Sequence, residues 1–241
     1  MLVSKYCRPA TCFTRNMSRA LSLSLLVVAR MSVLLAQTPA GSERPASLDR
    51  FLALDDPDPW QYRAVRHLEA RNEGLGKNAT MDVVTEGDAN GFRYQIVSEQ
   101  GSEYIRNRVF RQTLDTEKAI WASGAPTKAA LTLENYAFQE AGTQADGSPA
   151  LALRPLRKDV LLIDGKIFLS ADDCDLIRLE GKLSKSPSFW TRQVQITRWY
   201  KRFAGVRMPV ALETTANVRI AGQSTFRMTY QYESVNGVRF Q

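Results

Sequence analysis

Few residues of the chain have the types and spacing that catalysis or metal binding needs. His67 is the only histidine, and no constellation of carboxylates or cysteines around it indicates a metal site or a catalytic triad. Cys174 is the only cysteine after residue 36, so this part of the chain cannot form an internal disulfide. We therefore expect His67 to have a surface or packing role, and we expect no metal ion and no other cofactor.

Carboxylates gather at Asp172, Asp173 and Asp175, and paired carboxylates are what glycoside hydrolysis requires. Their context, Ser-Ala-Asp-Asp-Cys-Asp between two expected strands, is typical of a turn. The GxSxG, HExxH, GxGxxG and P-loop motifs of common hydrolases, metalloproteases and nucleotide-binding proteins do not occur. The sequence therefore predicts a protein that is not an enzyme. An unrecognised hydrolase remains the alternative.

Positive charge is the other feature that could select a partner. The net charge is +7, but residues 1–36 hold five of the 32 basic residues and no acidic residue. The remainder carries 27 basic and 25 acidic residues, and binding to phosphate backbones needs clustered positive charge. We therefore expect no nucleic-acid partner. Arg106, Arg108 and Arg111 are expected on a solvated helix face, with a phosphate or headgroup patch as the alternative.

The basic N-terminus instead indicates export. Residues 20–36 read ALSLSLLVVARMSVLLA and are followed by Gln-Thr-Pro, which matches a secretory signal peptide. Arg30 interrupts the apolar run before the about 20 residues that a spanning helix needs. We predict a signal peptide over residues 1–36, cleaved after Ala36 with Met17 as an alternative start, and a periplasmic destination. An uncleaved membrane anchor is the alternative; after cleavage no transmembrane span is expected.

Two helices are expected after the signal. Residues 37–47 are rich in Pro, Ser and Gly and are predicted to be a flexible leader to a single domain over residues 48–241. Asp58-Pro59 is a favourable helix start, and Gly74 marks the expected end. The apolar stripe of this first helix would consist of Trp60, Ala64, Val65 and Leu68. A second helix is expected after Ser102, which can cap it.

Most of the remaining chain has the two-residue period of strands with one apolar face. Residues 79–86 and 92–97 predict a hairpin, and so do residues 161–163 and 167–169 around Asp164-Gly165. Longer alternating stretches run over residues 177–183, 208–220 and 226–232. The sequence thus predicts an α+β fold that is mainly β, a half-open antiparallel β-barrel wrapped around two or so helices.

Short motifs in the C-terminal half add a resemblance to a known group. They are Asp173–Asp175, Leu176–Gly181, Lys185-Ser186-Pro187, Tyr200 and Gly205–Val210. With the order signal, helix, hairpin, helix and long meander, the chain resembles the bacterial envelope proteins of the LolA/LolB-like group. That group includes outer-membrane lipoprotein-sorting proteins and the N-terminal domain of the RseB sensor. The resemblance implies a concave apolar face that accepts acyl chains.

From the resemblance and the apolar strand faces we expect a non-enzymatic periplasmic protein that binds a lipid or a lipidated partner, such as a lipoprotein. The candidate lining residues are Phe92, Tyr94, Ile96, Phe189, Trp190, Val210, Leu212, Phe226, Met228 and Tyr230. Each of them can equally be plain core, because an apolar strand face looks the same beneath a helix or an acyl chain. The alternative is an envelope sensor or interaction module whose cavity is filled by its own helices and which binds a protein partner.

Overall fold

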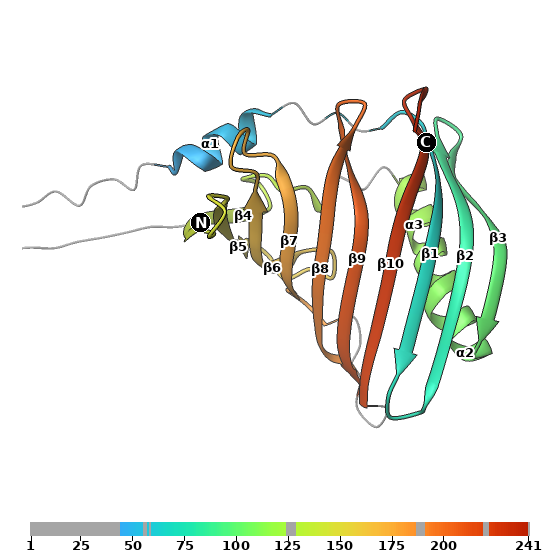
Figure 1. Cartoon of the computed structure of the whole chain (residues 1–241). Coiled ribbons are helices and arrows are strands. Elements are labelled where there is room, and N and C mark those ends of the chain that lie inside the picture. The colour runs from blue at the N-terminus through green and yellow to red at the C-terminus, as the bar shows by residue number, and fades with distance from the viewer. Residues whose placement is uncertain are drawn as a thin grey trace, which may run out of the picture. The chain divides into compact units, whose positions relative to one another are not determined.

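A computed structural model describes residues 44–240 except 55–56, 58, 124–128, 187–190 and 219–221 (Figure 1). The expected signal peptide and most of the expected leader lie outside these residues. So does the pair Phe189-Trp190. The signal, its cleavage and the role of this aromatic pair therefore stay predictions.

The described residues form one antiparallel sheet of eleven strands, in the order β3-β2-β1-β10-β9-β8-β7-β6-β5-β4 with β11 paired to β10 (Figure 1). Strands β3 and β4 are the two edges, so the sheet does not close on itself. The strands are β1 (Tyr62–Asn72), β2 (Lys77–Asp88), β3 (Gly91–Gly101), β4 (Tyr136–Thr143), β5 (Pro149–Pro155), β6 (Ile163–Leu169), β7 (Leu176–Leu183), β8 (Thr191–Phe203), β9 (Val206–Val218), β10 (Gly222–Val235) and β11 (Val238–Arg239). The expected mainly-β, half-open antiparallel fold is confirmed.

One helical segment covers the β1–β3 end of the sheet (Figure 1). It follows Ser102, as expected, and consists of α2 (Glu103–Ile105), the π-helical turn η1 (Arg106–Arg111) and α3 (Gln112–Ser123). Its Ile105, Phe110 and Leu114 side chains are buried against the sheet. These three positions are spaced five and four residues apart, which is the spacing that a π-helical turn inserted into an α-helix produces on one face.

A short helix, α1 (Ala46–Ala53), covers the opposite part of the sheet. Leu48 and Phe51 are its buried residues, with Leu52 partly buried beside them. The predicted leader over residues 37–47 therefore extends two residues too far, because its last residues, Ala46 and Ser47, begin α1. The buried Leu48 and Phe51 follow directly and face the sheet three positions apart, the spacing of one helix face.

The core consists of two apolar clusters on the same face of the sheet, which we call the concave face. The first cluster lies between α2–η1–α3 and strands β1, β2, β3, β9 and β10, and includes Leu68, Met81, Phe110 and Met228. The second cluster lies between α1 and strands β4–β7, and includes Phe51, Leu151, Ile167 and Leu179. Ile196 on β8 packs against both clusters. Strands β8 and β9 thus lie at the boundary between the two clusters.

The expected first helix is wrong, because residues 62–72 form strand β1. This strand pairs with β2 on one side and β10 on the other, for example at Leu68 with Met81 and Met228. Its inward residues alternate as Tyr62, Ala64, Arg66, Leu68 and Ala70. Arg66 breaks the apolar alternation in the middle of the strand, so the two-residue period is hidden in the sequence and a helical stripe appears in its place.

The expected hairpin at Asp164-Gly165 is also wrong, since both residues lie inside the continuous strand β6. Gly165 pairs with Gly181 of β7, and a Cβ on Gly165 would collide with the Glu180 carbonyl oxygen. This glycine permits a close approach of two strands, which is a different use of the residue from a turn. The predicted hairpin of residues 79–86 and 92–97 is confirmed as β2 and β3, and the predicted long strands are confirmed as β7, β9 and β10.

Candidate ligand-binding site

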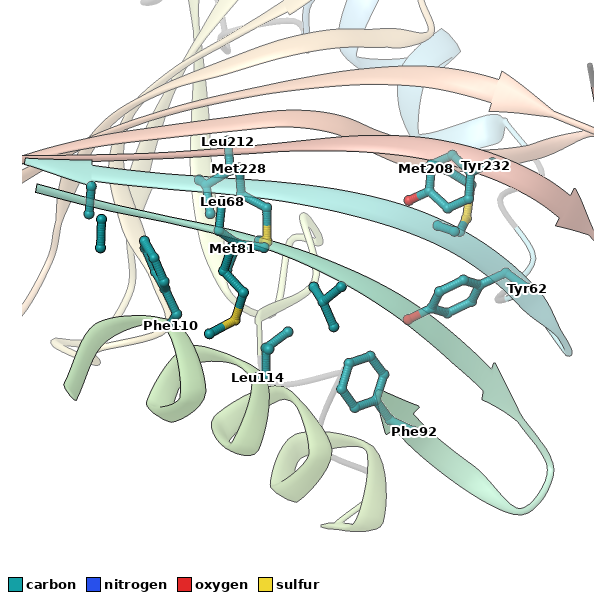
Figure 2. Close-up of a cluster of buried hydrophobic side chains, with 14 of the residues drawn as sticks. Tyr62, Leu68, Met81, Phe92, Phe110, Leu114, Met208, Leu212, Met228 and Tyr232 are labelled. Atoms are coloured by element: carbon teal, nitrogen blue, oxygen red, sulfur yellow. The ribbon is translucent and has the colours of Figure 1, made fainter. Parts of the chain in front are cut away.

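The candidate lining residues that the structure describes lie on the concave face, mostly within the first cluster. Phe92, Leu212 and Met228 are buried there, and the half-buried Tyr94, Ile96, Phe226 and Tyr230 pack against it. Figure 2 shows Phe110 and Leu114 of the helical segment pointing toward Met81 and the sheet. The Phe110 and Phe226 ring centroids are 6.0 Å apart. Helix side chains therefore cover much of the predicted lining.

Val210 is placed differently from the other described candidates. It is half-buried and lies on β9, next to the boundary between the two clusters. Ile196 and Val194 are half-buried on the adjoining strand β8. We call these three residues the boundary strip. Its apolar side chains retain partial exposure at the boundary between the two covered clusters.

A buried arginine, which sequence reasoning did not identify, lies within the first cluster. Arg66 is 1% exposed and donates two hydrogen bonds to the Glu117 carboxylate of α3, at 2.6 and 2.8 Å. It also donates to the Tyr62 hydroxyl at 2.9 Å. The two parallel bonds to one carboxylate are the geometry in which a guanidinium ion is best held. The pair joins the helical segment to β1 through the core.

Aromatic rings enclose the same guanidinium group. Its carbon atom lies 4.7 Å from the Tyr230 ring centroid and 5.3 Å from that of Phe92, both within cation–π range. Burial raises the pKa of both Tyr62 and Tyr230 above the ordinary value, so both hydroxyls stay protonated at neutral pH. Two residues of the predicted lining thus surround a cation whose charge Glu117 neutralises.

A second arginine, Arg198, lies on β8 where the boundary strip crosses the sheet. It is opposite Leu179 of β7 and Leu212 of β9, which belong to the second and first clusters. Its Nε atom is buried and has no hydrogen-bond partner among the described residues. Proximity to Tyr200 is the main cause that raises the pKa of Arg198. This cation is therefore held at the sheet with hydrogen-bonding capacity to spare.

Two residues of the C-terminal motifs, Asp175 and Arg207, come together beneath α1. Asp175 accepts hydrogen bonds from Arg202 at 2.7 Å and from Arg207 at 2.8 Å, and the Arg207 guanidinium lies 5.4 Å from the Phe51 ring centroid. Residues 171–173 form the predicted turn. Asp175 therefore acts as an anchor for two strands, and the Asp173 carboxylate accepts hydrogen bonds from the Ser170 hydroxyl and the Asp175 backbone N–H within the turn.

His67 lies on the outer face of the sheet, opposite the two clusters. Its Nδ1 is 2.6 Å from an Asp82 carboxylate oxygen, and its Nε2 is 3.1 Å from one of Glu69. Ser98 donates to the other Asp82 oxygen at 2.7 Å. The Ser98 hydroxyl bonds to the aspartate and not to the imidazole, so these side chains do not form the arrangement of a nucleophilic triad. The hydrogen bond that the His67 imidazole donates to the Asp82 carboxylate is the main cause that raises the pKa of His67.

Within the described ranges, no group of three or more His, Cys, Asp and Glu side chains is placed to hold a metal ion. Within the same ranges, no helix has both the length and the apolar character needed to cross a membrane.

The fold defines a curved antiparallel sheet with helices on one face, and some solved structures share this arrangement. Neither a family model nor a curated protein sequence matches the chain. A DUF1329 family protein from Desulfovibrio piger is similar at 8% identity and a TM-score of 0.40, over 77% of this chain and 90% of that chain. A LolA superfamily protein from Nitrosomonas europaea is similar at 11% identity and a TM-score of 0.36, over 77% and 90% of the two chains.

A domain assigned to an outer membrane lipoprotein-sorting protein of Vibrio parahaemolyticus is also similar, at 10% identity and a TM-score of 0.35, over 80% of this chain and 91% of that chain. Two of the three structures carry the name of the group that the C-terminal motifs resemble. The likeness concerns the arrangement of the sheet and helices, and it carries no conclusion about a ligand.

Proposed function

We propose that the chain is an exported, non-enzymatic periplasmic protein that binds the acyl chain of a lipid or of a lipidated partner on its concave face. The boundary strip is the proposed contact, because its apolar side chains are partly exposed between two clusters that helices already cover. Covering such a strip is favourable by about 25 cal/mol per Å² of apolar surface removed from water.

The observation that carries the proposal is the position of Arg198 beside this strip. A buried polar atom without a partner costs free energy, which a ligand can recover by accepting a hydrogen bond. An acyl chain that ends in a carbonyl, carboxylate or phosphate group supplies an acceptor and apolar length in one molecule. The strip and the arginine together therefore favour an amphiphile over a purely apolar ligand.

The test is native mass spectrometry of the mature protein after gentle extraction, followed by titration with a fluorescent fatty acid. We expect a co-purifying lipid and saturable probe binding. Val210→Asp places a charge in the boundary strip and should weaken probe binding at least tenfold. Ala211→Asp, at the neighbouring position on the outer face, is the matched control and should bind like the parent. Absence of both lipid and probe binding would overturn the proposal.

A second function is favoured by how thoroughly the first cluster is filled. Phe110 and Leu114 are fully buried against the sheet, as they would be in a sensor or interaction module whose helices occupy its own cavity. This alternative predicts no lipid and no probe binding, but a protein partner in crosslinked envelope extracts. The same titration therefore separates the two functions before any partner is sought.

A further inference from the structure

The outer face carries a groove that runs across five strands, on the side of the sheet away from the two clusters. Its volume is about 750 Å³, and three successive cross-strand rows of residues line it. One wall is the row Gln100, Thr80, Glu69, Arg227 and Glu213; the other is Asn78, Arg71, Thr225 and Thr215; the floor between them is Gly101, Ala79, Ala70, Phe226 and Thr214.

The alternation of strand side chains places this groove on the outer face. Ala70 and Ala79 are buried beneath the helical segment, so the neighbouring residues on each strand project outward and form the walls. The floor is then the paired backbone of the middle row. Two residues along a strand separate the walls by about 7 Å, and four inter-strand spacings give a length of about 19 Å. The groove therefore suits a long, narrow ligand.

The chemistry of the walls excludes several kinds of ligand. Each wall residue carries a polar group, so an acyl chain lying in the groove would leave these groups without hydrogen-bond partners. Two carboxylates, Glu69 and Glu213, balance two guanidinium groups, and the Arg227–Glu213 pair is 3.4 Å apart. The balance disfavours nucleic acids and other strongly charged partners. The floor peptides are engaged in the ladders of the sheet, so an added peptide strand cannot pair with them.

The remaining groups are hydroxyls, amides and a balanced set of charges, along both sides of a narrow groove. The hydroxyls of Thr80, Thr215 and Thr225 can both donate and accept hydrogen bonds. The side-chain amides of Asn78 and Gln100 can do the same, because each has an NH2 donor and a carbonyl acceptor. A ligand matched to these walls is neutral and presents hydroxyl groups along both of its edges. We propose that this groove binds a linear, neutral oligosaccharide.

The test uses isothermal titration of the mature protein with three linear hexasaccharides, of β-1,4-glucose, α-1,4-glucose and N-acetylglucosamine. We expect at least one to bind with a dissociation constant below about 1 mM. Thr225→Val and Thr215→Val keep the side-chain shape and remove one hydroxyl each. Each should weaken binding by about two- to tenfold, the value of one hydrogen bond.

Two control variants show whether a loss of sugar binding is specific to this groove. Thr229→Val, on the same strand and the same face but outside the groove, should bind the sugar like the parent. Val210→Asp on the concave face should also leave sugar binding unchanged, which makes the result independent of the proposed acyl site. Failure of all three sugars to bind, or equal binding by the parent and the Thr225→Val/Thr215→Val double variant, would overturn the proposal.

Discussion

Arg66 brings a positive charge into the apolar first cluster, and the Glu117 carboxylate balances it. Glu117 contributes both oxygens, and its own side chain is 28% exposed while that of Arg66 is 2% exposed. A buried ion pair is a weak source of stability as a pair, but loss of one partner leaves an uncompensated charge. The ion pair itself therefore adds little stability, but removing the Glu117 carboxylate should strongly weaken the packing of the helical segment on the sheet.

The first prediction concerns this pair. Glu117→Gln should lower the free energy of unfolding by about 3 kcal/mol, because the Arg66 guanidinium stays buried without its counter-charge. The double variant Arg66→Met/Glu117→Gln should recover a large part of that loss, since no charge is then buried. Urea unfolding of both variants measures the difference. Lys118→Gln, an exposed neighbour on α3, is the control, and equal losses in the single and double variants would contradict the interpretation.

The second prediction concerns pH and His67. Its pKa is raised in the folded state and that of Asp82 is lowered, chiefly by their mutual hydrogen bond. The contribution of His67 is therefore fully present below the unfolded-state pKa of about 6.5 and is lost as pH rises through the folded pKa. The contribution of Asp82 is lost only under more acidic conditions, as pH falls through its lowered pKa.

His67→Gln should consequently destabilise the protein more at pH 5.5 than at pH 8.5. The difference should stay below about 1 kcal/mol, because the His67 side chain is 43% exposed and its ion pairs are screened by water. Thermal unfolding of the parent and the variant at both pH values measures it. The same loss at both pH values would show that the charge of the imidazole plays no part.

At the scale of elements, the sequence and the structure agree where one strand face is uniformly apolar. Strands β9 and β10 were predictable because their inward positions hold apolar or small residues over many residues. Strand β1 was not, because Arg66 occupies an inward position and its partner Glu117 is 51 residues away. No local pattern can show that a distant carboxylate makes an arginine acceptable in a core.

The same reasoning applies to the site. The apolar candidates of β3, β9 and β10 follow from alternation alone, and all of those in the described residues lie on the concave face. Arg66 and Arg198 could not be found in this way, since an arginine in a strand is normally read as solvent-facing. The one available signal was Arg66 at an even position between Ala64 and Leu68, which a strand interpretation would have placed inward.

The third prediction concerns the glycines that join β6 and β7. Gly181→Ala would place a methyl group 2.5 Å from the Asp164 carbonyl oxygen and 2.8 Å from the Gly165 Cα atom. These are backbone atoms that cannot move aside without separating the strands. We expect a loss of about 1–3 kcal/mol in the free energy of unfolding, measured with urea. Lys182→Ala, the exposed next residue, is the control; a parent-like Gly181→Ala would show that the strands can separate freely.

At the scale of the whole molecule, the fourth prediction concerns the N-terminus. When the full chain is expressed in a Gram-negative host, intact-mass measurement of periplasmic material should show a chain that begins at residue 37. The reason is the basic segment, the apolar run and the small residue at Ala36. A chain that retains residues 1–36 and fractionates with membranes would instead support the uncleaved anchor.

The two faces of the sheet have different chemistry, and this separation organises both proposals. The concave face carries the two apolar clusters, whereas the groove on the outer face carries hydroxyl groups, amides and balanced charges. Variants at Val210 and Thr225 therefore act on opposite sides of the same sheet. Their effects on the two ligands should be independent, as they are for distant sites that share no partner.

The buried arginine also bears on how the chain selects one pairing among several during folding. Strand β1 joins β2 and β3 to β10, and its partners on β10 lie more than 150 positions away in the sequence. A slip of one residue would turn Arg66 outward and the four ionisable residues Arg63, His67, Glu69 and Arg71 inward. Four ionisable side chains would then face the core, whereas the native alignment buries one arginine with a matched carboxylate. Arg66 thus makes the correct alignment of the longest-range junction in the sheet energetically distinct from its nearest competitors.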